Sequence, residues 1–301
     1  MIKDLENIFT TSHAKIMDVF MSLEKSKTSI ITSDKWKRSE GGGGHTFVIQ
    51  DGDFFDNCAV NFSSISGNKL PKAALGKLIS EPSKHGYRAM GVSVIAHPKN
   101  PFIPTSHMNI RLFCLMGGNN TIKKWWIGGG YYLTPYLPIK EDCVKWHNEA
   151  KETLDSYNKG FYKKFSKNCN EYFYIPHRKE RRGIGGLFFD NLSNMSIEKS
   201  TDMLSDIANT YLESYQSIIN RRKSTKFDKK QKEFQLLRRG RYAEFNLIYD
   251  RGTSFGLQSN GRIESILASL PKDVKWSYKK DKNYIKMEKE ALKYINKDWN
   301  V

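Results

Sequence analysis

The sequence predicts an α+β fold in which a large, mostly antiparallel β-sheet is flanked by α-helices. Short segments of alternating apolar and polar residues follow one another through hairpin-like turns, which is typical of antiparallel strands. Segments with helical apolar spacing lie mainly before and after these strands. The 301 residues contain no Gly/Ser linker, low-complexity tract or internal repeat. We therefore expect residues 1–301 to form a single domain with a sizeable core.

The order of the elements follows from these patterns. Leu5, Phe9 and Ile16 recur at helical spacing, so residues 1–28 are assigned to an N-terminal helix. Asp51-Gly52 is a hairpin signal between two alternating segments. Strands are predicted at 44–50, 53–63, 91–97, 107–116, 122–128, 185–190 and 242–249, and further helices at 140–158, 159–175, 197–222, 228–238 and 284–295.

Alternation within three predicted strands places polar side chains on one face of the sheet. The opposite face of residues 107–116 is apolar and is expected to pack under helices. The polar faces together would form the floor of a wet pocket, although a sheet that simply exposes them to water is the alternative. The residues concerned are Ser93 and His97 in the first strand, His107, Asn109 and Arg111 in the second, and Tyr242, Glu244 and Asn246 in the third.

Residues 177–190, HRKERRGIGGLFFD, form the most informative segment. An imidazole and a cluster of cations, including Arg178 and Arg182, precede a glycine-rich turn and a short apolar strand. Arginine presents a planar fork of donors that matches a carboxylate in two places, and glycine lets the backbone approach a ligand closely. The segment is therefore a candidate carboxylate-binding site. A solvated, charged turn is the alternative.

Composition restricts the class of protein. The formal net charge of +17 indicates an anionic partner, and both nucleic acid and a polycarboxylate fit that description. The longest apolar runs fall short of the roughly 18 residues that a membrane span needs. The first residues, MIKDLENIF, resemble neither a secretory signal nor a transit peptide. The four cysteines form no C-x-x-C pair, so we expect reduced thiols and a cytoplasmic location.

Several ordered blocks carry a resemblance to a known family. They read WKRSEGGGG at 36–44, HPKNPFIPTSHMNIR at 97–111, WWIGGGYYLTPY at 125–136 and RRGRYAEFNLIYDRGTSFGL at 238–257, with the HRKERRGIGG segment between them and Asp298-Trp299 near the end. Together they resemble the oxygen-dependent coproporphyrinogen III oxidases, from about residue 30 to the C-terminus. The resemblance implies the same fold, a broad antiparallel sheet covered by helices.

The resemblance also implies a reaction. Two propionates of coproporphyrinogen III would be oxidatively decarboxylated to vinyl groups, giving protoporphyrinogen IX in haem biosynthesis with dioxygen as the oxidant. The sequence carries no G-x-G-x-x-G after a predicted strand and no haem-attachment motif. We accordingly expect no organic cofactor, with dioxygen as the co-substrate.

Functional residues follow from the same resemblance. It implies a proton donor at His107, a role that suits an imidazole because its ordinary pKa lies near neutrality. Members described as metal-dependent imply a divalent-metal site, although the spacing of the matching histidines forms no local metal motif. The implied substrate contacts are Ser93, Asn109, Ile110, Arg111, Asn260, Gly261 and Arg262, with Arg178 and Arg182 as further cations; the implied metal ligands are His97, His107, His147 and His177.

Tyr132 departs from the family pattern. Where the family has Gly-Gly-x-Asp-Leu-Thr-Pro, residues 129–135 read GGYYLTP, so a tyrosine stands at the position of a catalytic carboxylate. A phenol stays neutral at pH 7 and cannot stabilise positive charge as a carboxylate would. We expect Tyr132 to lower or redirect turnover unless another acid, such as nearby Glu141 or Asp142, fills the role.

The resemblance further implies a homodimer, with the subunit contact at about residues 242–277. Two other functions remain open at this stage. A porphyrinogen-binding homologue with weakened or lost catalysis is favoured by Tyr132 alone. A basic nucleic-acid-binding module is favoured by the net charge and the 13% aromatic content, but no RNA-recognition motif or zinc knuckle supports it. We therefore expect no nucleic-acid partner.

Overall fold

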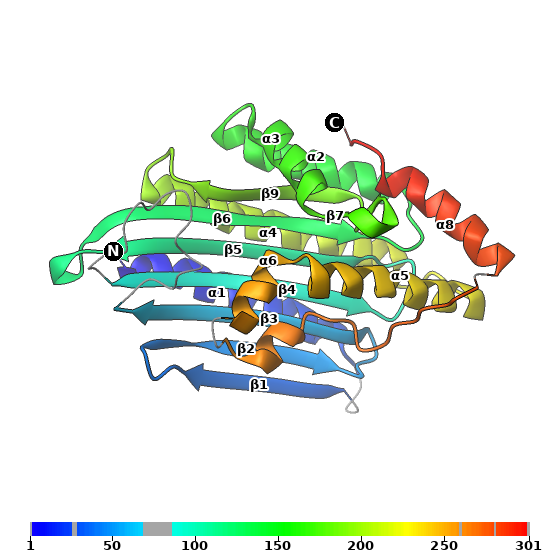
Figure 1. Ribbon diagram of the computed structural model, residues 1–301, viewed down its shortest axis with the longest axis horizontal. Helices are drawn as coiled ribbons and strands as arrows, with labels where there is room; N and C mark the ends of the chain where they lie inside the picture. The colour runs from blue at the N-terminus through cyan, green and yellow to red at the C-terminus, as the bar shows by residue number, and fades with distance from the viewer. Residues whose placement is uncertain (1, 26–28, 69–85, 259–260, 280, 300–301) are drawn as a thin grey trace.

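The computed structural model describes residues 2–25, 29–68, 86–258, 261–279 and 281–299. Within these ranges, seven strands form one antiparallel sheet in the order β1-β2-β3-β4-β5-β6-β9 (Figure 1). Each of the first five strands pairs with the next one along the chain, and β9 pairs with β6. The strands are β1 Ile30–Lys37, β2 Gly42–Gln50, β3 Phe55–Gly67, β4 Tyr87–Pro98, β5 Thr105–Met116, β6 Ile122–Thr134 and β9 Gly185–Leu192. The predicted fold class is confirmed.

Helices cover both faces of this sheet (Figure 1). One layer, behind the sheet in the figure, contains α1 Ile2–Leu23, α4 Ile197–Arg222 and α2 Lys140–Tyr157, and α3 Phe161–Tyr172 packs beside β9 at the edge of the sheet. The other face is crossed by α5 Lys229–Ile248, α6 Arg251–Gln258 and α7 Ile263–Leu267, with α8 Lys282–Ile295 packed against α5. Two short connections complete the described elements: η2 Gly118–Asn120 between β5 and β6, and η3 Pro176–Arg178 inside the small hairpin of β7 Tyr174–Ile175 and β8 Glu180–Arg181.

The main hydrophobic core lies between the sheet and the layer of α1 to α4. Alternate residues of β5, such as Met108 and Ile110, are completely buried there, together with Tyr211 of α4 and Trp146 of α2. Because side chains alternate along a strand, the neighbouring residues of β5 point to the face that α5 to α7 cross. No described helix is both long enough and apolar enough to cross a membrane.

Two sequence predictions about the elements were wrong or incomplete. Residues 242–249 are not a strand, because α5 continues through them to Ile248. A capping box begins this helix: Asp228 accepts the backbone N–H of Gln231, whose side chain accepts that of Asp228. In the helix, Tyr242 and Phe245 are buried together at a spacing of three residues, which the alternation argument overlooked. The edge strand β1 was not predicted, and most of its side chains are exposed.

The other predicted elements are present, some with shifted ends. The predicted N-terminal helix at 1–28 is observed as Ile2–Leu23, and residues 1 and 26–28 lie outside the described residues. Asp51 adopts a positive φ of 54° at the turn between β2 and β3, as the hairpin signal indicated. β6 runs to Thr134, beyond the predicted end at residue 128, because its three consecutive glycines stay in the sheet and pair with β5. This extension brings Tyr132 into the sheet.

Candidate functional site

Four polar side chains lie together on the sheet face that α5 to α7 partly cover. We call Ser93, His107, Asn109 and Arg111 the polar floor. Ser93 on β4 is directly opposite Asn109 on β5, and all four side chains are partly exposed. The predicted polar face of β5 is thus confirmed. Ile110, also expected to contact substrate, is completely buried, so its side chain lies on the far side of the sheet from the floor.

Glycines make room for the guanidinium of Arg111. Gly91 on β4 and Gly128 on β6 are its direct neighbours across the sheet. A Cβ atom on Gly128 would lie 2.8 Å from Nε and Nη2 of Arg111 and 2.8 Å from Oδ1 of Asp190, closer than real Cβ atoms approach. The glycine run of the WWIGGG block therefore keeps this part of the floor open for a long cationic side chain.

The ion pair of Arg111 is exposed and readily exchanged. Its Nη2 donates to Oδ1 of Asp190 at 2.6 Å, and its Nη1 donates to Oδ1 of Asn109 at 2.8 Å. The side chains of Arg111 and Asp190 are 41% and 35% exposed. Exposed pairs contribute about 1 kcal/mol or less, so a ligand carboxylate can displace Asp190. Arg251, whose Nη2 lies 3.9 Å from Oδ2 of Asp190, adds a second cation at this rim.

Arg262 supplies a cation at the opposite rim, above β1 to β3. It precedes α7 and pairs with Asp34 of β1; both side chains are about one-third exposed. Ser265 anchors α7 to the sheet, because its carbonyl accepts the Asn61 side-chain amide at 3.1 Å and its hydroxyl lies 2.8 Å from that of Thr46. The span from β5 to β1 is four strand spacings, or about 19 Å, so the cations are distributed across the face rather than concentrated at one point.

Of the two residues before Arg262 that were predicted to contact substrate, the structure describes only Gly261. Asn260 lies outside the described residues. Gly261 donates its N–H to the carbonyl of Gly256 at 2.9 Å, and a Cβ atom there would lie 2.7 Å from that oxygen and 2.9 Å from Ile266. Gly261 therefore permits the close approach of α6 and α7.

His107 lies on β5, between β4 and β6. Its direct neighbours across the sheet are Ile95 of β4 and Tyr132 of β6. Within the described part of the chain, its ring makes no hydrogen bond. Burial, reinforced by the charge of Arg182, lowers the pKa of His107 well below its ordinary 6.5, and Asp250 opposes that shift. The imidazole is therefore neutral near pH 7 and able to accept a proton.

Asp250, at the junction of α5 and α6, is the carboxylate whose charge opposes the lowered pKa of His107. Its Oδ2 accepts the backbone N–H and hydroxyl of Thr253 at 2.8 Å, and its Oδ1 accepts the hydroxyl of Tyr172 at 2.9 Å. Burial alone would raise the pKa of Asp250, but the hydrogen bonds from Thr253 and the charge of Arg182 outweigh it, and the net shift is downward. Asp250 is thus an anion at neutral pH.

Tyr132 is enclosed rather than available to the floor. Its side chain is 1% exposed, and its hydroxyl accepts the backbone N–H of Gly183 at 2.5 Å. Its ring packs 4.3 Å from that of Phe173, and the guanidinium of Arg182 lies 4.8 Å from its centroid. Burial raises the pKa of Tyr132 well above its ordinary value of 10, so this phenol does not supply an anion.

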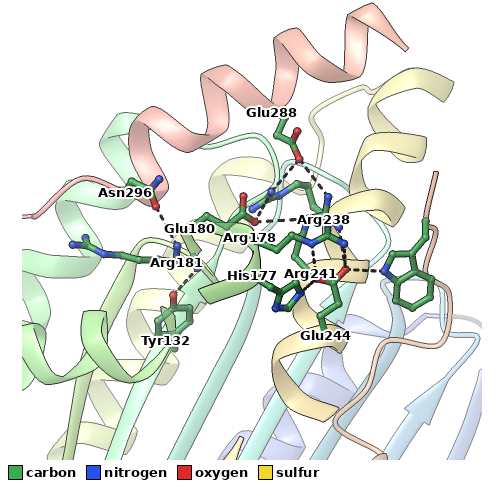
Figure 2. A network of polar contacts seen from close by, with 12 residues as sticks. Tyr132, His177, Arg178, Glu180, Arg181, Arg238, Arg241, Glu244, Glu288 and Asn296 are labelled. Atoms are coloured by element: carbon green, nitrogen blue, oxygen red, sulfur yellow. Dashed lines mark hydrogen bonds and ion pairs between the residues drawn. The ribbon is translucent and has the colours of Figure 1, made fainter. Parts of the chain in front are cut away.

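Arg178 is paired inside a network of charges (Figure 2). Its Nε and Nη2 donate to the two carboxylate oxygens of Glu244 at 2.8 and 2.7 Å. Glu244 also accepts from Trp276 at 2.9 Å and contacts His177 at 2.8 Å. Burial would raise the pKa of Glu244, but these donors, Arg178 foremost, lower it to about 2. In this structure Arg178 thus holds a carboxylate of the protein itself, and its predicted contact with substrate stays a prediction.

The other charged residues of the network form ion pairs with one another. Figure 2 shows Arg238 and Arg241 turned toward Glu180 and Glu288. The closest contact is 2.8 Å between Nη1 of Arg238 and Oε1 of Glu180, and both side chains are nearly completely buried. Arg241 reaches Glu288 at 3.7 Å. These pairs join the small β7–β8 hairpin to α5 and α8.

The four histidines expected to bind a metal do not fit a common site. His97 is completely buried, with Nδ1 3.0 Å from the Thr105 hydroxyl and Nε2 3.0 Å from the Ser269 carbonyl. His147, on α2, is engaged equally, by the Tyr162 hydroxyl and the Ile184 carbonyl. Across the described residues, no three His, Cys, Asp or Glu side chains are placed to hold a metal ion. We derive no step through a metal.

Three further candidates, Arg182, Asp142 and Glu141, are not part of the polar floor. Arg182 is 2% exposed and surrounded by aromatic rings. Asp142 accepts from Arg221 and Arg222 between α2 and α4, and Glu141 joins the same cluster. The carboxylates of Asp142 and Glu141 thus form ion pairs between helices on the other face of the sheet.

Sequence reasoning missed three residues of this site: Asp190, Asp250 and Arg251. Asp190 is the last residue of the strand predicted at 185–190, and Asp250 and Arg251 lie in the 238–257 block. A charged residue directly after an apolar run was the available signal. The wrong strand assignment at 242–249 hid the position of Asp250, because this residue lies at the bend between α5 and α6.

Comparisons with known proteins show which sequences this chain resembles. Residues 4–300 match the sequence model of a family described as coproporphyrinogen III oxidase. A protein of Francisella tularensis subsp. novicida, named oxygen-dependent coproporphyrinogen-III oxidase, is 42% identical over 305 residues, covering 99% of this chain and 98% of its own length. Proteins with the same name from Francisella philomiragia and Francisella tularensis subsp. holarctica show the same identity and coverage.

Proposed function

Because the chain belongs to the coproporphyrinogen III oxidase family, we propose that it decarboxylates coproporphyrinogen III oxidatively to protoporphyrinogen IX. The structural observation that supports this proposal is the polar floor, together with ion pairs whose protein carboxylates a ligand carboxylate can displace. Arg111, Arg251 and Arg262 each contact a carboxylate of the protein that is at least one-third exposed. A tetracarboxylate substrate matches cations that are spread over one face.

The reaction balances without an organic cofactor. For each propionate, the bond between the carboxyl carbon and the carbon beside it breaks, and carbon dioxide leaves. The other side-chain carbon, next to the pyrrole ring, loses a proton as the double bond forms. The two electrons removed pass to dioxygen, which takes up that proton and one from solvent to become hydrogen peroxide. The chain's own task is to hold the carboxylates, place one arm at the floor and exclude water. Ser93 and Asn109 supply hydrogen-bonding groups beside Arg111 for this purpose.

We propose that His107 and Asp250 handle the proton. In the unliganded chain His107 is neutral, which suits a proton acceptor. A propionate bound at Arg111 would bring a negative charge near the ring and raise its pKa, so His107 could then return the proton as a donor. Asp250 stabilises positive charge that develops nearby, a role that the enclosed phenol of Tyr132 does not serve.

An aerobic incubation with coproporphyrinogen III tests the function, with porphyrin fluorescence read after the products are oxidised. We expect protoporphyrin from the wild-type chain and none from an anaerobic control. Anaerobic binding of the substrate together with no aerobic product would instead identify a binding homologue, which is the reading that Tyr132 favours. No binding and no product would contradict both.

Tyr132→Asp separates the roles of the two acids. If Asp250 supplies the carboxylate that the site needs, restoring an acid at position 132 should change kcat by less than about threefold, because one preorganised group is already present. A rise of about 10²–10³-fold in kcat would instead show that the native chain lacks that group. Steady-state kinetics of wild type, Tyr132→Asp and Tyr132→Asn provide the comparison, with the amide as the uncharged control.

We also propose a homodimer formed through α5 to α7. Leu247, Ile248, Leu257 and Ile263 are all large apolar residues of these helices and are 42–62% exposed, whereas Phe245 of the same region is core. Ile248→Asp should therefore shift the mass in light scattering from twice the chain mass toward the monomer. Ile285→Asp, at an exposed residue of α8, is the matched control. A monomeric wild-type chain would contradict the proposal.

A cytoplasmic location fits the state of the cysteines. Cys58, Cys114, Cys143 and Cys169 are all buried free thiols, as expected where disulfides do not form. Burial raises the pKa of each thiol, so none is a reactive thiolate at neutral pH. We propose that the protein acts in the cytoplasm.

A further inference from the structure

The guanidinium of Arg182 has an unoccupied edge. Its Nη1 donates to Oδ1 of Asn246 at 2.8 Å. Its Nε and Nη2 make no hydrogen bond to any residue that the structure describes, although the side chain is only 2% exposed. Nε and Nη2 lie on one side of the guanidinium and form a fork that can hold both oxygens of a carboxylate. Burying N–H donors without hydrogen-bond partners raises the free energy of the folded chain. An anion bound at this edge would remove that cost.

Arg178 shows the same fork when it is occupied. Four residues before Arg182, its Nε and Nη2 donate to the two oxygens of Glu244 at 2.8 and 2.7 Å. The two arginines therefore present the same pair of atoms, one pair holding a carboxylate and the other holding nothing. The same two atoms of Arg182 could therefore hold both oxygens of a carboxylate.

Aromatic rings occupy the space around the unfilled fork. The Cζ atom of Arg182 lies 4.2–4.9 Å from the ring centroids of Tyr132, Phe173, Tyr242 and Phe245. Attraction between the cation and these rings offsets part of the lost hydration, but it leaves the two N–H donors unsatisfied. The hydroxyl of Tyr242 is also buried without a hydrogen bond of normal geometry, so a second donor is available to the same ligand.

Among the rings around Arg182, Tyr132 lies on a strand that is paired with the polar floor, because it is directly opposite His107. It also packs with Phe173 and Phe245 in a small hydrophobic cluster. One hydrogen bond, from the Gly183 N–H to its hydroxyl, holds the Tyr132 side chain by its polar end. Turning this side chain aside would open the fork toward the floor.

We propose that Arg182 is a carboxylate-binding site that the ring of Tyr132 keeps closed. The ligand is a carboxylate on a short aliphatic arm, such as one propionate of the porphyrinogen; that choice of ligand rests on the proposed function, whereas the site itself does not. Entry of the carboxylate requires Tyr132 to leave the guanidinium, so the site exchanges one cation–π contact and one hydrogen bond for a two-point ion pair.

Formate and acetate test the site without porphyrinogen or oxygen. Tyr132→Ala removes the ring and leaves space beside the fork. We expect formate, added at constant ionic strength against chloride, to raise the Tm of this variant saturably, by about 3 °C at ten times its dissociation constant. Wild type, which keeps both the ring and its hydrogen bond, should not respond, and Tyr132→Phe, which keeps the ring alone, should respond less than Tyr132→Ala. Formamide, a neutral molecule of the same shape, should have no effect on any of them.

The double variant Tyr132→Ala/Arg182→Gln identifies the cation. Its response to formate should be lost, because glutamine keeps a hydrogen-bonding side chain but no charged fork. An equal response in this double variant would overturn the proposal, as would a folded Tyr132→Ala chain whose Tm formate does not change. Circular dichroism at 25 °C establishes that each variant is folded before it is scored.

An internal carboxylate provides the second measurement, in case Tyr132→Ala does not fold. Tyr132→Asp should melt at a higher temperature than Tyr132→Asn at pH 7, and the difference should vanish when Arg182→Gln is added to both. The same Asp–Asn difference with and without Arg182 would contradict the proposal. These assays measure no turnover, so a failure here leaves the test of the enzymatic function intact, and a chain without oxidase activity can still bind formate.

Discussion

Arg111, Arg178 and Arg182 show how one kind of side chain is used in three ways. Arg111 holds an exposed carboxylate that a ligand can replace. Arg178 holds Glu244, which is 9% exposed and joined to several donors. Arg182 holds a single amide and is enclosed by rings. Their chemistry is identical, so the exposure and partner of each guanidinium decide whether it binds substrate or supports the fold.

Replacing Arg111 tests its role in binding. Arg111→Ala should raise KM for coproporphyrinogen III by about 10–150-fold, because a charge-assisted hydrogen bond contributes about 1.5–3 kcal/mol. Steady-state kinetics measure the effect. Arg38→Ala, which removes an arginine paired with Glu40 outside the floor, is the matched control and should leave KM unchanged. A wild-type KM in Arg111→Ala would remove this residue from the site.

Replacing Arg178 should affect stability instead. Arg178→Gln leaves the buried Glu244 without its main partner, so we expect a loss of about 2–3 kcal/mol in the free energy of unfolding. The value lies below that for fully buried pairs because Arg178 is 36% exposed. Urea unfolding measures it, and Arg178→Gln/Glu244→Gln should recover part of the loss. If KM rises sharply while stability stays unchanged, Arg178 binds substrate after all.

At the scale of elements, α5 connects the charge network to the site. The same helix carries Arg238 and Glu244 of the network, Tyr242 and Asn246 beside Arg182, and ends at Ile248 just before Asp250. A strand in this place would have turned these residues alternately to two faces. As a helix, α5 presents these residues to the charge network and to Arg182, and it leads into Asp250 at the bend before α6.

The N-cap of α5 is therefore expected to stabilise the whole helix. Asp228→Ala removes the side-chain acceptor of the capping box and should lower the free energy of unfolding by about 1 kcal/mol. Asp228→Ser, which keeps a capping oxygen, should lose much less. Urea denaturation of both variants measures the difference. Equal losses in the two variants would show that capping by the side chain contributes little to α5.

At the scale of the whole molecule, the two faces of one sheet divide the work. One face is apolar and joins α1 to α4 in the main core. The other face carries the polar floor and is only partly covered by α5 to α7 (Figure 1). A rigid, fully packed face behind the floor holds its residues in register, while the open face leaves Arg111 and Asp190 accessible. Stability and binding thus reside on opposite sides of the same strands.

Buried histidines should make the stability of this molecule depend on pH. Burial lowers the pKa of His97 to about 3 and that of His147 to about 4, from an ordinary 6.5. The unfolded chain binds these protons more readily, so the free energy of unfolding should fall as the pH is lowered from 6.5 toward 4. His147→Gln should reduce that slope by up to about 1.4 kcal/mol per pH unit. Urea unfolding at several pH values measures the slopes, and identical slopes would contradict the assignment.

Local patterns determined much of this protein. Alternation along β5 was enough to assign His107, Asn109 and Arg111 to one face, because the side-chain period of a strand does not depend on its neighbours. Hairpin signals such as Asp51-Gly52 likewise predicted antiparallel pairing of sequential strands. The resemblance in ordered blocks indicated the family, and the match over residues 4–300 confirms it.

Only the tertiary structure decided which partners these residues meet. Glu244 occupies the fork of Arg178, and Asn246 accepts from Arg182, because α5 is a helix. His97, for its part, is engaged by Thr105 and a backbone carbonyl. Burial and pairing depend on residues far apart in the chain, so periodicity along one segment carries no information about them.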